Sequence, residues 1–282
     1  MSAPRVFTRE NGVGYLDSAV DPALWTALIP AAGRGTRLGF DHPKILFPIA
    51  GRPILEWLVD LLKPLCGQFV FVLSPQGVSP VEQALSPLLP SRFVPALQQK
   101  PLGMADAIRC GLARVETTHT LIVWGDQVAV KPESLEFLMR LHQGTAYPSA
   151  TCPTLWRDHP YIHFERTESG RVSRILQARE GDQMPVRGES DSGVFLFRTE
   201  ALRQSLPRLL DSHECIGAKT REQNFLPIFP LLDPEQLITA PIMTESESVG
   251  VNSPQDAAYL EKLLPTPDSR TEPRPQGSVT TK

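Results

Sequence analysis

The 282-residue sequence lacks the hallmarks of several protein classes. Its four cysteines, at positions 66, 110, 152 and 215, form no CxxC pair and no Cys/His cluster at zinc spacing, which argues against structural zinc and a disulfide framework. No apolar run approaches the ~20 residues that a membrane helix needs, and the first ten residues hold no apolar signal-peptide core. These absences predict a soluble, cytoplasmic protein without a membrane partner.

An excess of charge of one sign is also lacking. Lys and Arg number 28 and Asp and Glu number 31, which gives a formal net charge of -3. A chain so balanced has no general attraction for nucleic acid or for an anionic membrane, so any phosphate binding must be local. Hydrophobic residues make up 41% and charged residues 21%, which are ordinary globular values.

Composition and periodicity divide the chain into three parts. Residues 1–22 show no period and predict a loose N-terminal extension. Residues 23–264 carry the apolar patterns of one domain, with a first half over about 23–145 and a second half over about 146–264. Residues 265–282 are rich in Pro, Ser, Thr and charge, which predicts a disordered tail.

The first half alternates between apolar runs and helical patterns. Residues 25–30, 69–73 and 120–124 are nearly continuous apolar runs of strand length, with helical periodicity between them. This alternation predicts an α/β fold with a Rossmann-like, mostly parallel sheet flanked by helices on both faces. The second half predicts a hairpin over 161–176 and further short strands, that is, a small β-rich subdomain.

A glycine-rich loop follows the first apolar run. It reads Ala31-Ala32-Gly33-Arg34-Gly35-Thr36-Arg37 and is followed by Pro43-Lys44. Glycines let backbone N–H groups approach phosphate oxygens, and Arg37 and Lys44 add positive charge. The third glycine falls one place late for a dinucleotide fingerprint, at Gly39, and no GxxxxGK[ST] is present. By itself the loop is compatible with a phosphate cradle and with a purely structural turn.

Several blocks together resemble a known family. Residues 28–37 and 43–55 are similar to the signature of sugar-phosphate nucleotidyltransferases, as in N-acetylglucosamine-1-phosphate uridylyltransferase domains and glucose-1-phosphate thymidylyltransferases. Further blocks follow in the family's order, at residues 97–107, 123–126, 191–195 and 249–252. The resemblance implies a nucleotide-diphospho-sugar transferase fold whose β-rich subdomain binds the sugar. The sequence carries none of the β-helix acyltransferase repeats of some bifunctional relatives.

The resemblance implies roles for single residues on the nucleotide side. Arg37 would offset charge on the departing pyrophosphate and Lys44 charge at the α-phosphate, so both would be catalytic. Gln98 would hydrogen-bond the edge of the base, with Gly103 packed against it. The implied nucleotide-binding set is Ala31, Ala32, Gly33, Gly35, Thr36, Gln98 and Gly103.

The metal and acceptor sides are implied in the same way. Asp126 and Asn252 would hold Mg²⁺, an ion that prefers oxygen ligands. Gln177, Arg179 and Asp191 would meet the acceptor, and here the sequence departs from the family pattern. An acid expected after residues 175–176 is Gln177, and Asp191 replaces an amide. These departures indicate an acceptor other than N-acetylglucosamine 1-phosphate.

The implied reaction transfers a nucleoside monophosphate from an NTP to a phosphorylated small-molecule acceptor and releases pyrophosphate. The acceptor phosphate is already ionised at neutral pH, so positioning and charge neutralisation suffice. Three alternatives stay open: a cytidylyltransferase for a phosphonate or choline-like phosphate, a guanylyltransferase of the molybdopterin-cofactor type, and a catalytically silent nucleotide-binding regulator. The sequence also leaves open the base, the acceptor and a homo-oligomeric state.

Overall fold

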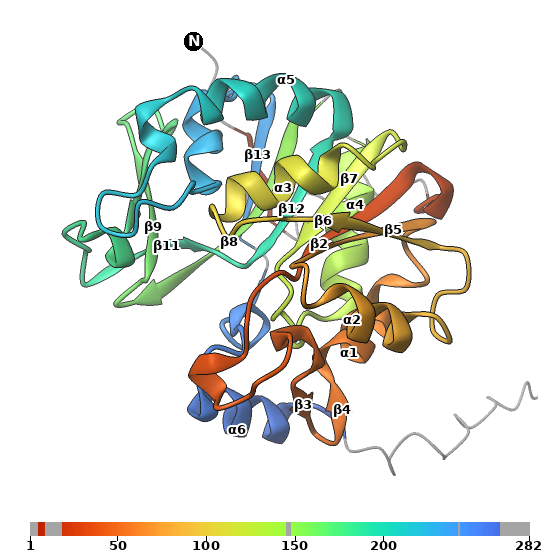
Figure 1. The fold of residues 1–282 in the computed structure, drawn as a ribbon. Coiled ribbons are helices and arrows are strands. Elements are labelled where there is room, and N and C mark those ends of the chain that lie inside the picture. Colours follow the sequence, from red (N-terminus) through yellow and green to blue (C-terminus); the bar gives the residue numbers. More distant parts are fainter. Residues whose placement is uncertain (1–4, 9–18, 145–147, 242, 266–282) are drawn as a thin grey trace, which may run out of the picture.

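The computed structural model describes residues 5–8, 19–144, 148–241 and 243–265 (Figure 1). Its centre is a nine-stranded sheet in the order β1-β13-β8-β12-β7-β2-β5-β6, with β11 paired to β8. The strands are β1 (Arg5–Val6), β2 (Trp25–Pro30), β5 (Gln68–Leu73), β6 (Phe93–Leu97), β7 (His119–Val123), β8 (Ala150–Asp158), β11 (Arg187–Asp191), β12 (Val194–Arg198) and β13 (Leu237–Ala240).

Helices cover both faces of this sheet, as predicted. They are α1 (Ile54–Leu62), α2 (Val78–Leu85), α3 (Met104–Leu112), α4 (Pro132–Gly144), α5 (Thr199–Leu210) and α6 (Pro254–Leu263). On β2, Ala27 and Ile29 pack into one core with α1, α2 and α4, whereas Leu28 packs into a second core with α3 and α5. Figure 1 shows α3 and α5 on one side of the sheet and α1 and α2 on the other. Burial on both faces explains why these strands have no polar alternation.

The sheet is mostly parallel, with an antiparallel insertion. Strands β7, β2, β5 and β6 run parallel, but β12 is antiparallel to both β7 and β8. Beyond the sheet, β9 (Ile162–Arg166) and β10 (Val172–Gln177) form the predicted hairpin, and β3 (Pro48–Ile49) pairs with β4 (Arg52–Pro53). Together with β8 and β11, the hairpin makes up the expected β-rich part.

Strands β8 and β11 were not predicted from the sequence. The β8 segment contains Pro153, and the β11 segment, Arg-Gly-Glu-Ser-Asp, is almost wholly polar. The two segments pair with each other over a register that joins Arg187 to Asp158 and Asp191 to Thr154, and β8 also pairs with β12 and β13. The two predicted halves therefore share one sheet, and the boundary near residue 145 falls outside the described residues.

The prediction of a loose extension over 1–22 is wrong for part of that segment. Arg5–Val6 forms β1, parallel to β13, and the Phe7 N–H donates to the Thr239 carbonyl at 3.0 Å. The Phe7 side chain is buried. A strand of two residues is too short to show a period, and it forms because β13 offers open backbone groups at its edge. Residues 9–18 lie outside the described residues, and so does the predicted tail over 265–282 apart from its first residue.

Short 3₁₀ turns complete the fold and place several site residues. They are η2 (Pro22–Leu24), η3 (Thr36–Leu38), η4 (Lys44–Leu46), η5 (Ala178–Glu180), η6 (His213–Cys215), η7 (Leu226–Leu231) and η8 (Ser246–Ser248). The apolar segment over 225–232 thus forms a 3₁₀ turn, consistent with its prolines Pro227 and Pro230. Within the described residues no helix combines the length and apolar character that a bilayer crossing requires.

Candidate functional site

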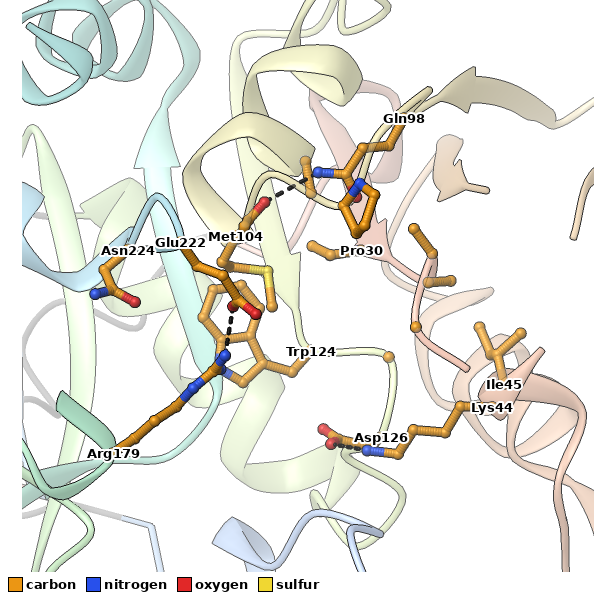
Figure 2. Close-up of a pocket in the computed structure, with 17 residues that line it drawn as sticks. Pro30, Lys44, Ile45, Gln98, Met104, Trp124, Asp126, Arg179, Glu222 and Asn224 are labelled. Atoms are coloured by element: carbon orange, nitrogen blue, oxygen red, sulfur yellow. Dashed lines mark hydrogen bonds and ion pairs between the residues drawn. The ribbon is translucent and has the colours of Figure 1, made fainter. Parts of the chain in front are cut away.

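A pocket of about 280 Å³ lies at the carboxyl ends of β2, β6 and β7. Parallel strands commonly place their ligand sites at this edge. Figure 2 shows Lys44 and Ile45 on one side of the pocket and Arg179, Glu222 and Asn224 on the other. The lining residues are Pro30, Ala31, Ala32, Gly33, Lys44, Ile45, Gln98, Pro101, Gly103, Met104, Ala107, Trp124, Gly125, Asp126, Arg179, Glu222 and Asn224.

The glycine loop brings unpaired backbone donors to this pocket. Within the described part of the chain, the N–H groups of Ala32, Gly33 and Arg34 have no hydrogen-bond partner. The loop is held in place by a backbone hydrogen bond, in which the Lys44 N–H donates to the Gly33 carbonyl at 3.0 Å. A Cβ on Gly33 would meet nothing within 4 Å, so this glycine borders open space. Consecutive unpaired N–H groups beside open space form an anion-binding concavity.

A second cluster joins Lys44, Asp126 and Asn252. The Lys44 ammonium lies 2.6 Å from Asp126 Oδ2 and 2.9 Å from Asn252 Oδ1. The Lys44 and Asp126 side chains are only 19% and 17% exposed. Three elements far apart in sequence therefore meet at one charge centre: the start of η4, the end of β7 and the segment before α6. The Val251 N–H fixes that segment by donating to the Asp126 carbonyl at 3.1 Å.

The Asp126 and Asn252 oxygens fit the predicted magnesium site. Both point at one position, which the ammonium of Lys44 occupies, so the pair presents two oxygen ligands to a single cation. Mg²⁺ is commonly bound by one or two carboxylates together with waters and substrate phosphates, so a small protein ligand set suffices. Among the described residues, no three His, Cys, Asp or Glu side chains are grouped as a metal site.

The predicted base-reading residues form a tight unit. Gln98, which is 6% exposed, donates through Nε2 to the Gly103 carbonyl at 3.0 Å and to Asp106 Oδ2 at 2.9 Å. Gly103 has φ +126°, and a Cβ on it would lie 2.4 Å from the Gln223 nitrogen. This glycine is therefore required by the packing of residue 223 as well as by its place in the pocket.

Arg179 lies across the pocket from Lys44 and pairs with Glu222. Its guanidinium is 2.6 Å from the Glu222 carboxylate, and both side chains are 40% exposed (Figure 2). The loop that carries Glu222 is anchored by buried Glu180, which accepts the Lys219 and Thr220 N–H groups at 3.0 and 3.1 Å. Burial acts to raise the pKa of Glu180, but the hydrogen bonds from Thr220 and Lys219 outweigh it and hold this pKa below its ordinary value.

Eight of the predicted site residues line the pocket: Ala31, Ala32, Gly33, Lys44, Gln98, Gly103, Asp126 and Arg179. Asn252 joins them through its hydrogen bond to Lys44. Gly35, Thr36, Arg37, Gln177 and Asp191 are not part of the lining.

The predicted residues outside the lining have distinct surroundings. Arg37 is exposed on η3 and has no ion pair or hydrogen bond to other described side chains. Gln177 is buried, and its N–H donates to Asp182 at 2.8 Å. Asp191 accepts the Gly193 N–H at 3.0 Å, and burial raises its pKa.

Sequence reasoning did not identify Glu222 and Asn224. They lie in a loop without apolar period, and contacts with distant segments bring this loop to the pocket. In one of them, the Gln223 N–H donates to the Leu102 carbonyl at 2.7 Å and the Gln223 carbonyl accepts the Ala105 N–H at 2.9 Å. No local signal in the sequence indicates such a pairing.

The chain is similar to known proteins over much of its length. The chain is 27% identical over 245 residues to the bifunctional protein GlmU of Lawsonia intracellularis, which covers 84% of this chain and 51% of that protein. It is 30% identical over 247 residues to the GlmU of Bacillus cytotoxicus, with the same two shares, and 31% identical over 191 residues to that of Mycobacterium marinum, with 64% and 39%. The chain thus spans about half the length, or less, of these curated relatives.

A solved structure shares the fold. The 4-diphosphocytidyl-2C-methyl-D-erythritol synthase of Anaerococcus prevotii superposes with a TM-score of 0.61 at 12% identity, over 86% of this chain and 98% of that chain. The family model of the MobA-like NTP transferase domain matches residues 27–192, which include the glycine loop, Lys44, Gln98 and Asp126. The chain therefore belongs to the family of MobA-like NTP transferase domains.

Proposed function

We propose that this protein transfers a nucleoside monophosphate from an NTP to a sugar 1-phosphate or a similar phosphorylated acceptor, forming an NDP-sugar or its analogue and pyrophosphate. The observation that carries the proposal is the meeting, in one pocket, of unpaired backbone N–H groups, the Lys44 ammonium and the Asp126 carboxylate. Such groups bind and neutralise a triphosphate, and the pocket lies at the strand ends where ligands of this fold class bind.

The N–H groups of Ala32, Gly33 and Arg34 receive the triphosphate oxygens. Lys44 turns from Asp126 to the α-phosphate, where negative charge accumulates as the acceptor oxygen approaches. The acceptor phosphate attacks the α-phosphorus in line, and pyrophosphate leaves on the opposite side. Because the attacking phosphate is ionised at neutral pH, the pocket supplies position and charge neutralisation and no general base is required.

Asp126 and Asn252 would hold Mg²⁺, which supplies charge neutralisation at the phosphate oxygens when bound. Arg37 belongs to the same proposal as a contact for the departing pyrophosphate. Its exposed guanidinium, with no ion pair to another described residue, follows the glycine loop directly. Cytoplasmic location and a homo-oligomeric state remain predictions from the sequence.

On the acceptor side, we assign Arg179 to the acceptor phosphate, with Gln177 and Asp191 as outer contacts. The ion pair with Glu222 orients the Arg179 guanidinium at the pocket wall. Glu222 also supports an alternative acceptor class, because a carboxylate at the pocket wall suits a cationic group such as that of a choline-like phosphate or an aminated phosphonate. The alternative keeps the reaction and changes only the acceptor.

A substrate matrix tests the proposal. ATP, GTP, CTP, UTP and dTTP are each combined with a panel of sugar 1-phosphates, choline phosphate and phosphonates, and released pyrophosphate is measured with and without Mg²⁺. We expect release with at least one pair, and only with the divalent ion. Tight nucleotide binding without release from any pair would contradict the proposal and favour a nucleotide-binding regulator.

A further inference from the structure

The side-chain amide of Gln98 is oriented by two acceptors. Its Nε2 donates to the Asp106 carboxylate at 2.9 Å and to the Gly103 carbonyl at 3.0 Å. An amide nitrogen has two hydrogens, and both partners can only accept, so the positions of nitrogen and oxygen follow from the chemistry of the partners. The Gln98 Oε1 atom has no hydrogen bond to any described residue. It is therefore the polar atom of Gln98 that remains for a ligand of the pocket.

Asp106 is itself held in place. It is 3% exposed in the first turn of α3, and its Oδ1 accepts from Arg109 Nη2 at 2.6 Å and from Arg109 Nε at 3.2 Å. Its Oδ2 is left for Gln98. Both oxygens of Asp106 thus accept hydrogen bonds, one from Gln98 and one from Arg109. A carboxylate cannot donate, so the amide of Gln98 cannot invert without losing both of its bonds.

We propose, on the basis of the proposed function, that Asp106 is a positioning residue for base selection. It fixes Gln98 so that only an acceptor faces the nucleobase, and the base bound here must donate an N–H to Oε1. Suitable donors are the imide N–H of uracil or thymine, the exocyclic amine of cytosine or adenine, and the N1–H or 2-amine of guanine. A base without a donor at that edge would leave the largely buried Oε1 unpaired and would bind more weakly.

Nucleotide analogues that lack one N–H test this proposal. UTP is compared with 3-deaza-UTP, CTP with zebularine triphosphate, ATP with nebularine triphosphate, and GTP with both ITP and 2-aminopurine riboside triphosphate. For the parent that binds tightest by calorimetry, we expect its analogue, or one of the two for GTP, to bind and react about 10- to 100-fold less well. If that analogue, or for GTP both analogues, match the parent within threefold, the proposal is overturned.

The variant Asp106→Asn separates positioning from packing. Its amide can donate to Oε1, so Gln98 can invert and offer its own N–H to the base. We expect the parent-to-analogue ratio to fall to within about threefold of unity. The matched control Arg109→Gln removes the ion pair, keeps the Asp106–Gln98 bond, and should retain the wild-type ratio. A wild-type ratio in Asp106→Asn would overturn the role of Asp106, and the analogue series with the wild-type protein stands even if this variant fails to fold.

Binding and turnover separate the two proposals. If nucleotides bind with the expected ratio but no acceptor gives pyrophosphate, the proposed function is wrong and the role of Asp106 stands. If pyrophosphate is released equally from parent and analogue, the proposed function stands and the role of Asp106 is wrong. If no nucleotide binds, both are wrong.

Discussion

Replacing Lys44 with Met should have two opposite effects, because the ammonium occupies the position at which the Asp126 and Asn252 oxygens converge. Methionine keeps the approximate length of the side chain and removes the charge. The loss of one charged donor at a developing negative charge costs about 2.7–4 kcal/mol in the transition state, or 10²- to 10³-fold in rate. We therefore expect pyrophosphate release by Lys44→Met to fall by about that factor.

The affinity of Lys44→Met for a divalent metal ion should rise, although its rate of turnover falls. A dication about 4 Å from an ammonium is repelled by about 8 kcal/mol at an effective dielectric constant of 20, so the two cannot share the Asp126–Asn252 position. Without nucleotide, Lys44 competes with the ion, and its removal should tighten Mn²⁺ binding at least tenfold by this argument. Electron paramagnetic resonance measures that affinity independently of activity.

Stability sets the third expectation for the same variant. The Lys44–Asp126 ion pair is mostly but not fully buried. Its loss should lower the free energy of unfolding by about 1–2 kcal/mol, which is less than for a fully buried ion pair. The matched control is Lys262→Met, which changes the same residue type on the exposed side of α6. Undiminished turnover together with unchanged Mn²⁺ affinity in Lys44→Met would refute the reasoning.

Three further predictions concern stability. Glu180→Ala leaves buried donors of the 217–224 loop unpaired and should lower the free energy of unfolding by about 2–4 kcal/mol, measured by urea denaturation, with a higher KM for the acceptor. Gly103→Ala should lose a similar amount, about 2–4 kcal/mol, since its Cβ would collide with the Gln223 backbone at positive φ, whereas Gly33→Ala should unfold like the wild type. Burial lowers the pKa of His142 well below 6.5 and that of His119 to about 4. Because both are neutral in the folded state and charge on unfolding, the stability they confer is complete above pH 6.5 and is lost as pH falls toward 4, so Tm should drop in that window and less steeply in His142→Phe; a flat Tm from pH 7 to 4.5 would contradict this.

The parts of the fold that were predictable are those whose cause is local. The runs that became β2, β5 and β7 are mostly apolar, without polar alternation, because helices cover both faces of each strand, and the sequence shows this pattern directly. The glycine loop was recognisable because its glycines and cations are adjacent in sequence. Asp126 was expected because it lies in one of the blocks that resemble the nucleotidyltransferase family, at residues 123–126.

Other elements depend on partners that are distant in sequence. Strand β1 is too short to show a period, β8 contains a proline, and β11 is almost wholly polar. They form because a neighbouring strand offers hydrogen bonds to each of them. The contact between Lys44 and Asn252 spans 208 positions. The loop that carries Glu222 is held at the pocket by its backbone pairing with residues 102 and 105 and by its hydrogen bonds to Glu180.

By itself the sequence indicated the class of chemistry, because the blocks that resemble the nucleotidyltransferase family are short, contiguous residue patterns. Only the tertiary structure decided how these groups face one another. It placed Lys44 between Asp126 and Asn252, left Arg37 outside the pocket lining, and oriented Gln98 against Asp106. Such arrangements follow from strand order and burial, which depend on the whole chain folding around one sheet and are therefore not written in any local stretch of residues.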